Sequence, residues 1–131
     1  GDLIRRFEGQ NVLVDIWATW CHPCIADFKH KSSIMPFVEA KQLQVLYISI
    51  DKRQWEDRWR QSIKINALAG NHFRADPEFI KDMWETIGDY QGAIPRYVLI
   101  DRHGKIYKST AARPGQGSEL VDQIRSLVDE N

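Results

Sequence analysis

Buried strands are the clearest feature of the hydrophobic pattern along this chain. Val12–Trp17, residues 45–50 and residues 97–101 are short apolar runs rich in β-branched and aromatic side chains. Such runs are typical of strands that are covered on both faces. Residues 102–104 then predict a hairpin turn, and residues 105–109 an antiparallel edge strand.

Helical periodicity fills the segments before and after these strands. We expect a helix from about Pro23 to Lys41, in which Pro36 produces a kink or a break because proline cannot donate the helical hydrogen bond. A closing helix is expected after Ser118, which is a good N-cap. The side chains expected on the buried face of the first helix are Ile25, Phe28, Ile34, Phe37 and Val38.

Two more helices are expected between the second and third strands. Trp55, Trp59 and Ile63 recur at every fourth position and predict one apolar helix face. Asp76 and Pro77 suit the N-cap and the first turn of the other helix. Residues 66–74 are expected to form an irregular loop.

The order of these elements predicts an α/β fold. It implies a central mixed sheet with a parallel pair, an antiparallel addition and helices on both faces. With 131 residues the chain has the size of one domain, so residues 1–131 are expected to form a single domain. The start at Gly1, without a Met and close to the first strand, is the start we expect of a domain excised from a longer protein.

Composition argues against several classes of partner. The formal net charge is zero, with 18 basic and 18 acidic residues, so the overall charge attracts neither nucleic acid nor an anionic membrane surface. No apolar run approaches the roughly 20 residues that a membrane span needs. The four histidines lack the spacing of zinc ligands, and we expect no metal site.

The only two cysteines, Cys21 and Cys24, stand where the first predicted helix begins. Unpaired amides and the positive end of the helix dipole favour a thiolate on the first cysteine of such a pair. A free cysteine has a pKa of about 8.5, and comparable settings lower it to roughly 3.5–7.5. We expect Cys21 to be the exposed attacking thiol and Cys24, one turn deeper, to be the resolving thiol.

His22 and Pro23 separate the two cysteines and are predicted to tune their redox chemistry. Pro23 has the preset backbone angle of a first helical turn. A protonated His22 favours the Cys21 thiolate, stabilises the reduced form and raises the reduction potential relative to a Gly-Pro pair. The alternative for His22 is a solvated residue without an effect on the dithiol.

Asp15 interrupts the apolar first strand. If its side chain points inward, burial raises the pKa of the carboxyl group, which can then take the proton from Cys24. The alternative is that Asp15 faces solvent on an edge strand.

VLVDIWATWCHPC, at residues 12–24, and AIPRYVLID, at residues 93–101, closely resemble the active-site strand and the cis-proline loop of thioredoxin-fold proteins. The residues alone leave the Ile94–Pro95 bond open between trans and cis, and the resemblance implies cis. It also implies that Trp20, Ile94 and Pro95 bind an extended segment of a partner protein.

The long segment from Asp51 to Ile94 resembles the TlpA/ResA-like branch of envelope thiol-disulfide oxidoreductases, as do WATWC and YVLIDRHGKI. This resemblance implies a helical insertion before the cis-proline strand and a place in the bacterial periplasm or cell envelope, with the cytoplasm as the alternative. Two departures stand out. Many relatives carry Asn at the position of Asp15, and the lysine that thioredoxin places near this acid has no counterpart on the second strand. Lys29 and His30 stand where relatives usually have proline.

We therefore predict an enzyme that uses the Cys-His-Pro-Cys dithiol to reduce disulfides in protein partners, with their oxidation or isomerisation as the alternative directions. It is expected to be a monomer without a cofactor, re-reduced by an upstream thiol-disulfide electron donor. Two alternatives are open. Trp55, Trp59 and Trp84 suggest a non-enzymatic thioredoxin-fold binding module. A peroxiredoxin-like thiol peroxidase shares the fold, but Val14 and Ala18 occupy the Pro and Thr/Ser positions of its motif.

Overall fold

The computed structural model describes residues 2–130, which are built around a mixed sheet of five strands in the order β3-β2-β1-β4-β5. β1, β2 and β3 run parallel, β4 is antiparallel to β1, and β5 is antiparallel to β4. The strands are β1 (Val12–Trp17), β2 (Gln44–Ser49), β3 (Asn71–Arg74), β4 (Arg96–Ile100) and β5 (Ile106–Ala111). The helices are α1 (Asp2–Arg5), α2 (His22–Ala40), the 3₁₀ helix η1 (Arg53–Trp55), α3 (Glu56–Ile65), α4 (Pro77–Ile87) and α5 (Glu119–Glu130).

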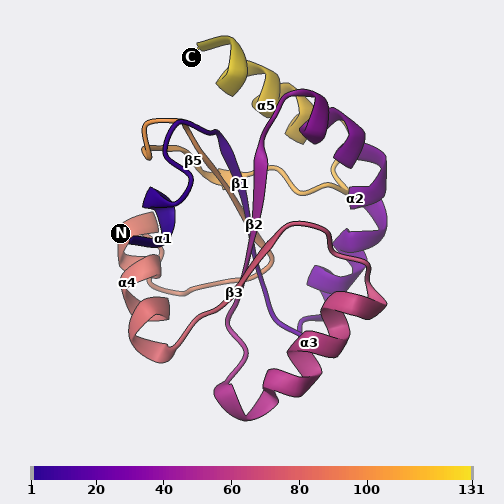
Figure 1. The fold of residues 1–131 in the computed structure, drawn as a ribbon, viewed down its shortest axis with the longest axis vertical. Helices are drawn as coiled ribbons and strands as arrows, with labels where there is room; N and C mark the ends of the chain where they lie inside the picture. Colours follow the sequence, from indigo (N-terminus) through magenta and orange to yellow (C-terminus); the bar gives the residue numbers. More distant parts are fainter. Residues whose placement is uncertain (1, 131) are drawn as a thin grey trace.

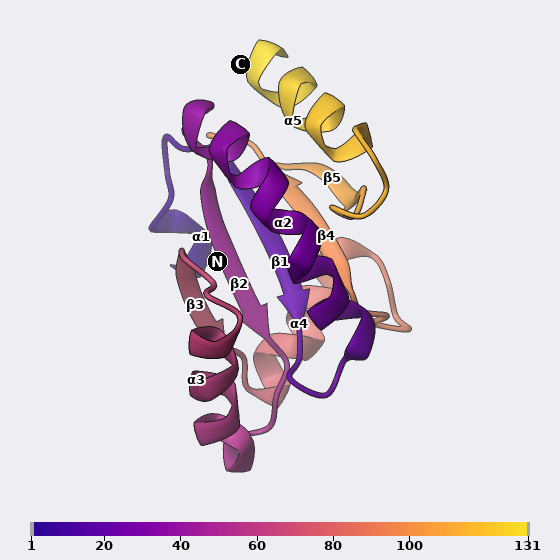
Figure 2. The same cartoon turned by 90° about the vertical axis from the view of Figure 1, so that its right-hand side faces the viewer.

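Helices cover both faces of the sheet. Figure 1 views the sheet nearly edge-on, with α1 and α4 on one side and α2, α3 and α5 on the other. Figure 2 shows α2 lying across the central strands, with α5 beside it. Alternate residues of β1 enter the two cores, because Leu13 and Trp17 face α2 whereas Val14 and Ile16 belong to the core under α4. The predicted α/β fold with a mixed sheet is confirmed.

β3 differs from the expectation of an irregular loop over residues 66–74. All of its residues are half-buried, so they lack the alternating pattern by which a strand is recognised. Pairing with β2 holds them instead, with His72 opposite Tyr47. The side-chain amide of Asn71 also donates a hydrogen bond from Nδ2 to the Val45 carbonyl at 3.0 Å. A strand this short at the edge of a sheet depends on its neighbour more than on its own composition.

α2 forms a single helix through Pro36, so the predicted break is wrong. Pro36 lies on the exposed face of α2, as does Ser32, whose carbonyl loses its helical donor to the proline. Water can bond that carbonyl, and the buried face therefore continues without interruption. The buried residues of α2 include Phe28, Ile34 and Val38, as expected, and also two charged residues, Asp27 and Lys31.

The helices of the insertion follow the predicted pattern with one exception. Asp76 caps α4 by accepting a hydrogen bond from the Phe79 amide at 2.8 Å, and Pro77 occupies the first turn. Trp59 and Ile63 of α3 pack against the core beside α2. Trp55, by contrast, ends η1 before α3 begins and remains 41% exposed, so its assignment to the apolar face is wrong.

Candidate active site

The two cysteines lie at the N-terminus of α2 and are joined by a disulfide. Cys21 is the N-cap residue, and its sulfur accepts a hydrogen bond from the Cys24 amide at 3.3 Å. Both are buried in this form, with 5% of Cys21 and 1% of Cys24 exposed, so the prediction that Cys21 is exposed is wrong for the disulfide form. A thiolate at Cys21 would receive the same amide hydrogen bond and the positive end of the helix dipole.

Asp51 fixes the loop that precedes Cys21. It follows β2, is 1% exposed, and accepts hydrogen bonds from the Thr19 amide at 3.0 Å and the Thr19 hydroxyl at 2.7 Å. The Ser49 hydroxyl donates a further hydrogen bond to Asp51 at 2.6 Å. Because these bonds join the end of β2 to the loop after β1, the position of Cys21 relative to the sheet is well determined.

The Ile94–Pro95 peptide bond is cis, which is the isomer that the resemblance implies. Arg96 lies opposite Ile16 in the antiparallel pair of β4 and β1, so Pro95 lies at the end of β1 from which the chain continues to the cysteines. Ile94 packs against the core cluster that contains both Cys21 and Cys24. The cis-proline loop and the dithiol therefore lie together at the end of the sheet where β1 ends.

The other residues predicted for this end are accessible. Trp20 is 59% exposed, and His22 and Pro23 are exposed at the start of α2. Arg96 forms an ion pair with Asp89, and its guanidinium lies 5.5 Å from the Trp84 ring centroid. Arg96 therefore holds the loop before Pro95 in place.

Asp15 is fully buried at the centre of β1. Its Oδ2 accepts a hydrogen bond from Lys31 Nζ at 2.8 Å, and the Lys31 side chain is only 3% exposed. The solvent-facing alternative for Asp15 is wrong. The acid also has a lysine partner after all, which comes from α2 rather than from the neighbouring strand.

Aromatic rings surround the Lys31 ammonium group. Tyr47 and Tyr97 lie opposite Asp15 on β2 and β4, one on each side of the carboxylate. A cation over an aromatic face is attracted to the ring, and more strongly where water is excluded. Lys31 Nζ lies 3.9 Å from the ring centroid of Tyr47, 5.5 Å from that of Tyr97 and 5.9 Å from that of Phe28.

Burial raises the pKa of the Asp15 carboxyl group above its ordinary value, and the attraction of Lys31 opposes this rise without cancelling it. Lys31 holds Oδ2, whereas Oδ1 has no hydrogen-bond partner of good geometry among the described residues. Burial and the nearby carboxylate also raise the pKa of Tyr97, which therefore stays a neutral phenol beside Asp15. The Tyr97 hydroxyl in turn lowers the pKa of Asp15, so Lys31 and Tyr97 both oppose the rise that burial causes, and the pKa remains raised.

A second buried acid, Asp27 of α2, forms an ion pair with Arg113. Arg113, in the segment between β5 and α5, donates from Nε to Oδ2 at 2.9 Å and from a terminal nitrogen to Oδ1 at 3.1 Å. This bidentate pair ties α2 to that segment, and Asp27 raises the pKa of Arg113. Besides burial, the negative charge of Asp27 also raises the pKa of Asp15.

Sequence reasoning missed Lys31, Asp27 and Asp51. The helical spacing held a signal for the first two, since Cys24, Asp27 and Lys31 lie three or four residues apart and share one face of α2. Charged residues on such a face are normally assigned to solvent, which hides them. No spacing in the sequence points to Asp51 as the partner of Thr19, because sheet pairing brings them together.

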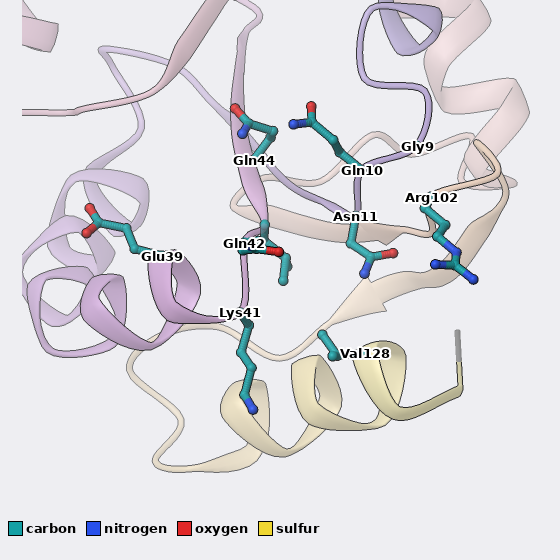
Figure 3. Close-up of a pocket in the computed structure, with 10 residues that line it drawn as sticks. Gly9, Gln10, Asn11, Glu39, Lys41, Gln42, Gln44, Arg102 and Val128 are labelled. Carbon is teal, nitrogen blue, oxygen red and sulfur yellow. The ribbon is translucent and has the colours of Figure 1, made fainter.

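A polar hollow of about 740 Å³ lies at the opposite end of the sheet, where β1 and β2 begin (Figure 3). Its lining includes Gln10, Lys41 and Arg102 but neither cysteine, so it is separate from the dithiol. Among residues 2–130, no group of three or more His, Cys, Asp or Glu side chains is arranged to hold a metal ion. None of the described helices has the length and apolarity of a membrane span.

Comparison with known proteins gives consistent matches. The family model described as Redoxin matches residues 2–124. The thiol-disulfide oxidoreductase ResA of Bacillus cereus is 23% identical over 128 residues, which cover 97% of this chain and 66% of that protein. ResA of Geobacillus thermodenitrificans is 21% identical over 106 residues, or 80% of this chain and 56% of that protein. The chain thus spans less than two thirds of the length of these relatives.

Solved structures share the shape of this chain. The thioredoxin domain of a thiol-disulfide oxidoreductase from Bacteroides vulgatus matches with a TM-score of 0.77 and 24% identity, over 95% of this chain and 83% of that one. A thioredoxin family thiol:disulfide interchange protein from Chlorobium tepidum matches with a TM-score of 0.75 and 18% identity, over 95% of this chain and 83% of that one. These likenesses confirm the predicted thioredoxin-like fold.

Replacing both members of the buried pair, as Asp15→Asn with Lys31→Met, should remove a pH dependence of stability. The pKa of Asp15 is raised in the folded protein above the ordinary 3.8, so the folded state holds this proton more tightly than the unfolded chain. That stabilisation is complete below the ordinary value and is lost as the pH rises through the raised folded pKa. Urea unfolding of the disulfide form should show wild type losing stability, relative to the double variant, as the pH rises.

The control for this comparison is Asp57→Asn, which neutralises an exposed aspartate of α3. Its free energy of unfolding should stay parallel to that of wild type at every pH. A difference between wild type and the double variant that does not change with pH would contradict a raised pKa at Asp15.

Proposed function

This chain belongs to the Redoxin family, and we propose that it is a thiol-disulfide oxidoreductase that reduces disulfides in partner proteins. The observation that carries the proposal is the Cys21–Cys24 pair at the N-terminus of α2, next to a cis-proline loop and on the helix whose Lys31 bonds the buried Asp15. The matching ResA proteins are thiol-disulfide oxidoreductases, which supports the same class of chemistry.

In the first step the Cys21 thiolate attacks one sulfur of the partner's disulfide. A mixed disulfide forms between Cys21 and the partner, and the partner's other sulfur leaves as a thiolate that takes a proton from solvent. The Cys24 amide, 3.3 Å from the Cys21 sulfur, favours the thiolate before the attack. His22, exposed beside Cys21, adds positive charge when it is protonated.

In the second step Cys24 attacks the Cys21 sulfur, and the partner leaves with both of its cysteines reduced. Two electrons have then passed from the dithiol to the partner, and Cys21 and Cys24 form a disulfide. Cys24 must first lose a proton, and Asp15 is the proposed acceptor. Two features support this assignment: the pKa of Asp15 is raised by burial, and its Oδ1 has no hydrogen-bond partner of good geometry among the described residues.

Lys31 sets the pH at which Asp15 can act. Without a cation, burial alone would keep the carboxyl group protonated and unable to accept a proton. The ammonium group at 2.8 Å opposes that effect, so the carboxylate form remains within reach. Cys24 and Lys31 are seven residues apart on one buried face of α2, roughly 10 Å along the helix. Because helical side chains lean toward the N-terminus, Lys31 extends toward the cysteine end.

Trp20, Ile94 and Pro95 are the proposed contacts for the substrate. An exposed tryptophan supplies apolar contact area on one side of the dithiol. Ile94 stands two residues before β4 begins at Arg96. Its backbone is suited to pair with an extended segment of the partner. The dithiol carries both electrons, so the proposed reaction uses no other cofactor.

The direction of electron flow and the location belong to the same proposal. We assign the chain as a reductase that receives electrons from an upstream dithiol protein and acts, as a monomer, in the bacterial periplasm or cell envelope. The similarity to ResA and to thiol:disulfide interchange proteins supports the thiol-disulfide chemistry on which this assignment rests.

Trapping tests the assigned order of the cysteines. Cys24→Ser removes the resolving thiol, so the reaction with insulin should stop at a covalent adduct that is visible on a non-reducing gel. Cys21→Ser removes the attacking thiol, so it should neither reduce insulin nor form the adduct. An adduct formed equally well by Cys21→Ser would contradict these roles.

The reduction potential tests the direction. A value near thioredoxin's, about −270 mV, is expected of a reductase, whereas a value near about −120 mV is that of a strong oxidant and would contradict the assigned direction. His22→Gly should lower the potential, because it removes a group that favours the reduced form. An unchanged potential together with an unchanged Cys21 pKa in that variant would exclude His22 from redox tuning.

A further inference from the structure

The insertion between β2 and β4 separates charge, although the whole chain is neutral. Residues 52–64 carry five basic and two acidic side chains, whereas residues 76–89 carry five acidic side chains and one lysine. α3 and α4, which hold most of these residues, lie on opposite sides of the sheet (Figure 1). The insertion therefore contributes mostly basic side chains on the α3 side of the sheet and mostly acidic ones on the α4 side.

The basic part of the insertion begins beside the dithiol. Hydrogen bonds join Asp51 to Thr19, which is two residues before Cys21. Lys52 and Arg53, which follow Asp51, are both exposed. The start of the basic segment is thus fixed against the loop that carries the attacking cysteine.

Exposed tryptophans accompany these charges. Trp20, before the dithiol, is 59% exposed, and Trp55, in the insertion, is 41% exposed. Trp59, also in the insertion, is half-buried and packs against the core. The Arg58 guanidinium lies 4.6 Å from the centroid of the Trp55 ring. Tryptophan and arginine are the residues most often found at the energetic centres of protein interfaces. We call Trp20, Lys52, Arg53, Trp55 and Arg58 the basic aromatic surface.

The cations of this surface are not neutralised within the described part of the chain. Arg60 and Arg74, nearby, both pair with Glu56. Lys52, Arg53 and Arg58 form no ion pair within residues 2–130. A segment with negative side chains would complement this surface, and a basic segment would be repelled.

We propose that the basic aromatic surface binds an acidic, extended segment of the partner protein, next to the disulfide that Cys21 attacks. The inference rests on the proposed function, which supplies the partner's disulfide, and it adds the charge of the substrate. Electrostatic complementarity of this kind acts mainly on specificity and on the rate of encounter. The mostly acidic side chains that the insertion contributes on the α4 side disfavour the same segment there.

Two pairs of peptides test this inference. The peptides of each pair are identical except that aspartates flank the central residue in one and lysines in the other. In the first pair that residue is serine and the peptides carry a fluorescent label, so that binding to the wild-type protein is measured without chemistry. In the second pair the central residue is a cysteine that takes part in a disulfide, so that the rate at which the protein reduces this disulfide is measured.

The acidic peptide should bind about five-fold more tightly at low ionic strength and should be reduced faster by a similar factor. Both ratios should fall toward one as added salt shortens the Debye length to about 3 Å near 1 M. The double variant Arg53→Glu with Arg58→Glu should reverse the preference. The control variant Lys105→Glu with Lys108→Glu makes the same change of charge around β5. It should retain the preference for the acidic peptide.

The two readouts separate the two proposals. A binding preference that Arg53→Glu with Arg58→Glu reverses, without reduction of any peptide, would support the surface and contradict the proposed reaction. Equal binding of both peptides, or a preference that the β5 variant changes as much, would overturn the surface whatever the rates are.

Discussion

The ion pair between Asp15 and Lys31 is the constraint on which the interior of this protein depends. A buried carboxylate or ammonium group costs several kcal/mol on its own, and removing one partner of such a pair typically costs about 3–5 kcal/mol. Each group is therefore stable inside the protein only because the other is 2.8 Å away. The pair joins the central strand to α2, so the helix has one favourable register against the sheet. Tyr47 and Tyr97 close the sides and keep water away.

This constraint couples the helix to the proposed chemistry. α2 carries both the cysteines and Lys31, so the element that positions the dithiol also supplies the cation that lowers the pKa of Asp15 against the effect of burial. Asp27 and Arg113 add a second contact of the same kind on the same helix face. The hydrogen bond from Thr19 to Asp51 acts where β1 and β2 end, and it fixes the loop before Cys21. The polar interior thus serves the site as well as the fold.

What the sequence could predict divides along physical lines. The strands β1, β2 and β4 and the capped helix α4 follow from local pattern, because burial on both faces and N-capping leave local signals. β3 leaves no such signal, since pairing with its neighbour determines it. The cysteines and Asp15 stand out by residue type and position. Lys31 does not, because a lysine on a helix is normally solvated and only packing against β1 shows that this one is buried.

In the mechanism that we propose, Asp15 takes the proton of Cys24 at a pH that Lys31 sets. The most direct test is the rate at which a mixed disulfide on Cys21 is resolved, measured against pH in wild type, Lys31→Met and Asp15→Asn. We predict that Asp15→Asn slows resolution at neutral pH by at least about ten-fold, and that Lys31→Met moves the rise of the rate to higher pH. Identical pH profiles for the three proteins would contradict it.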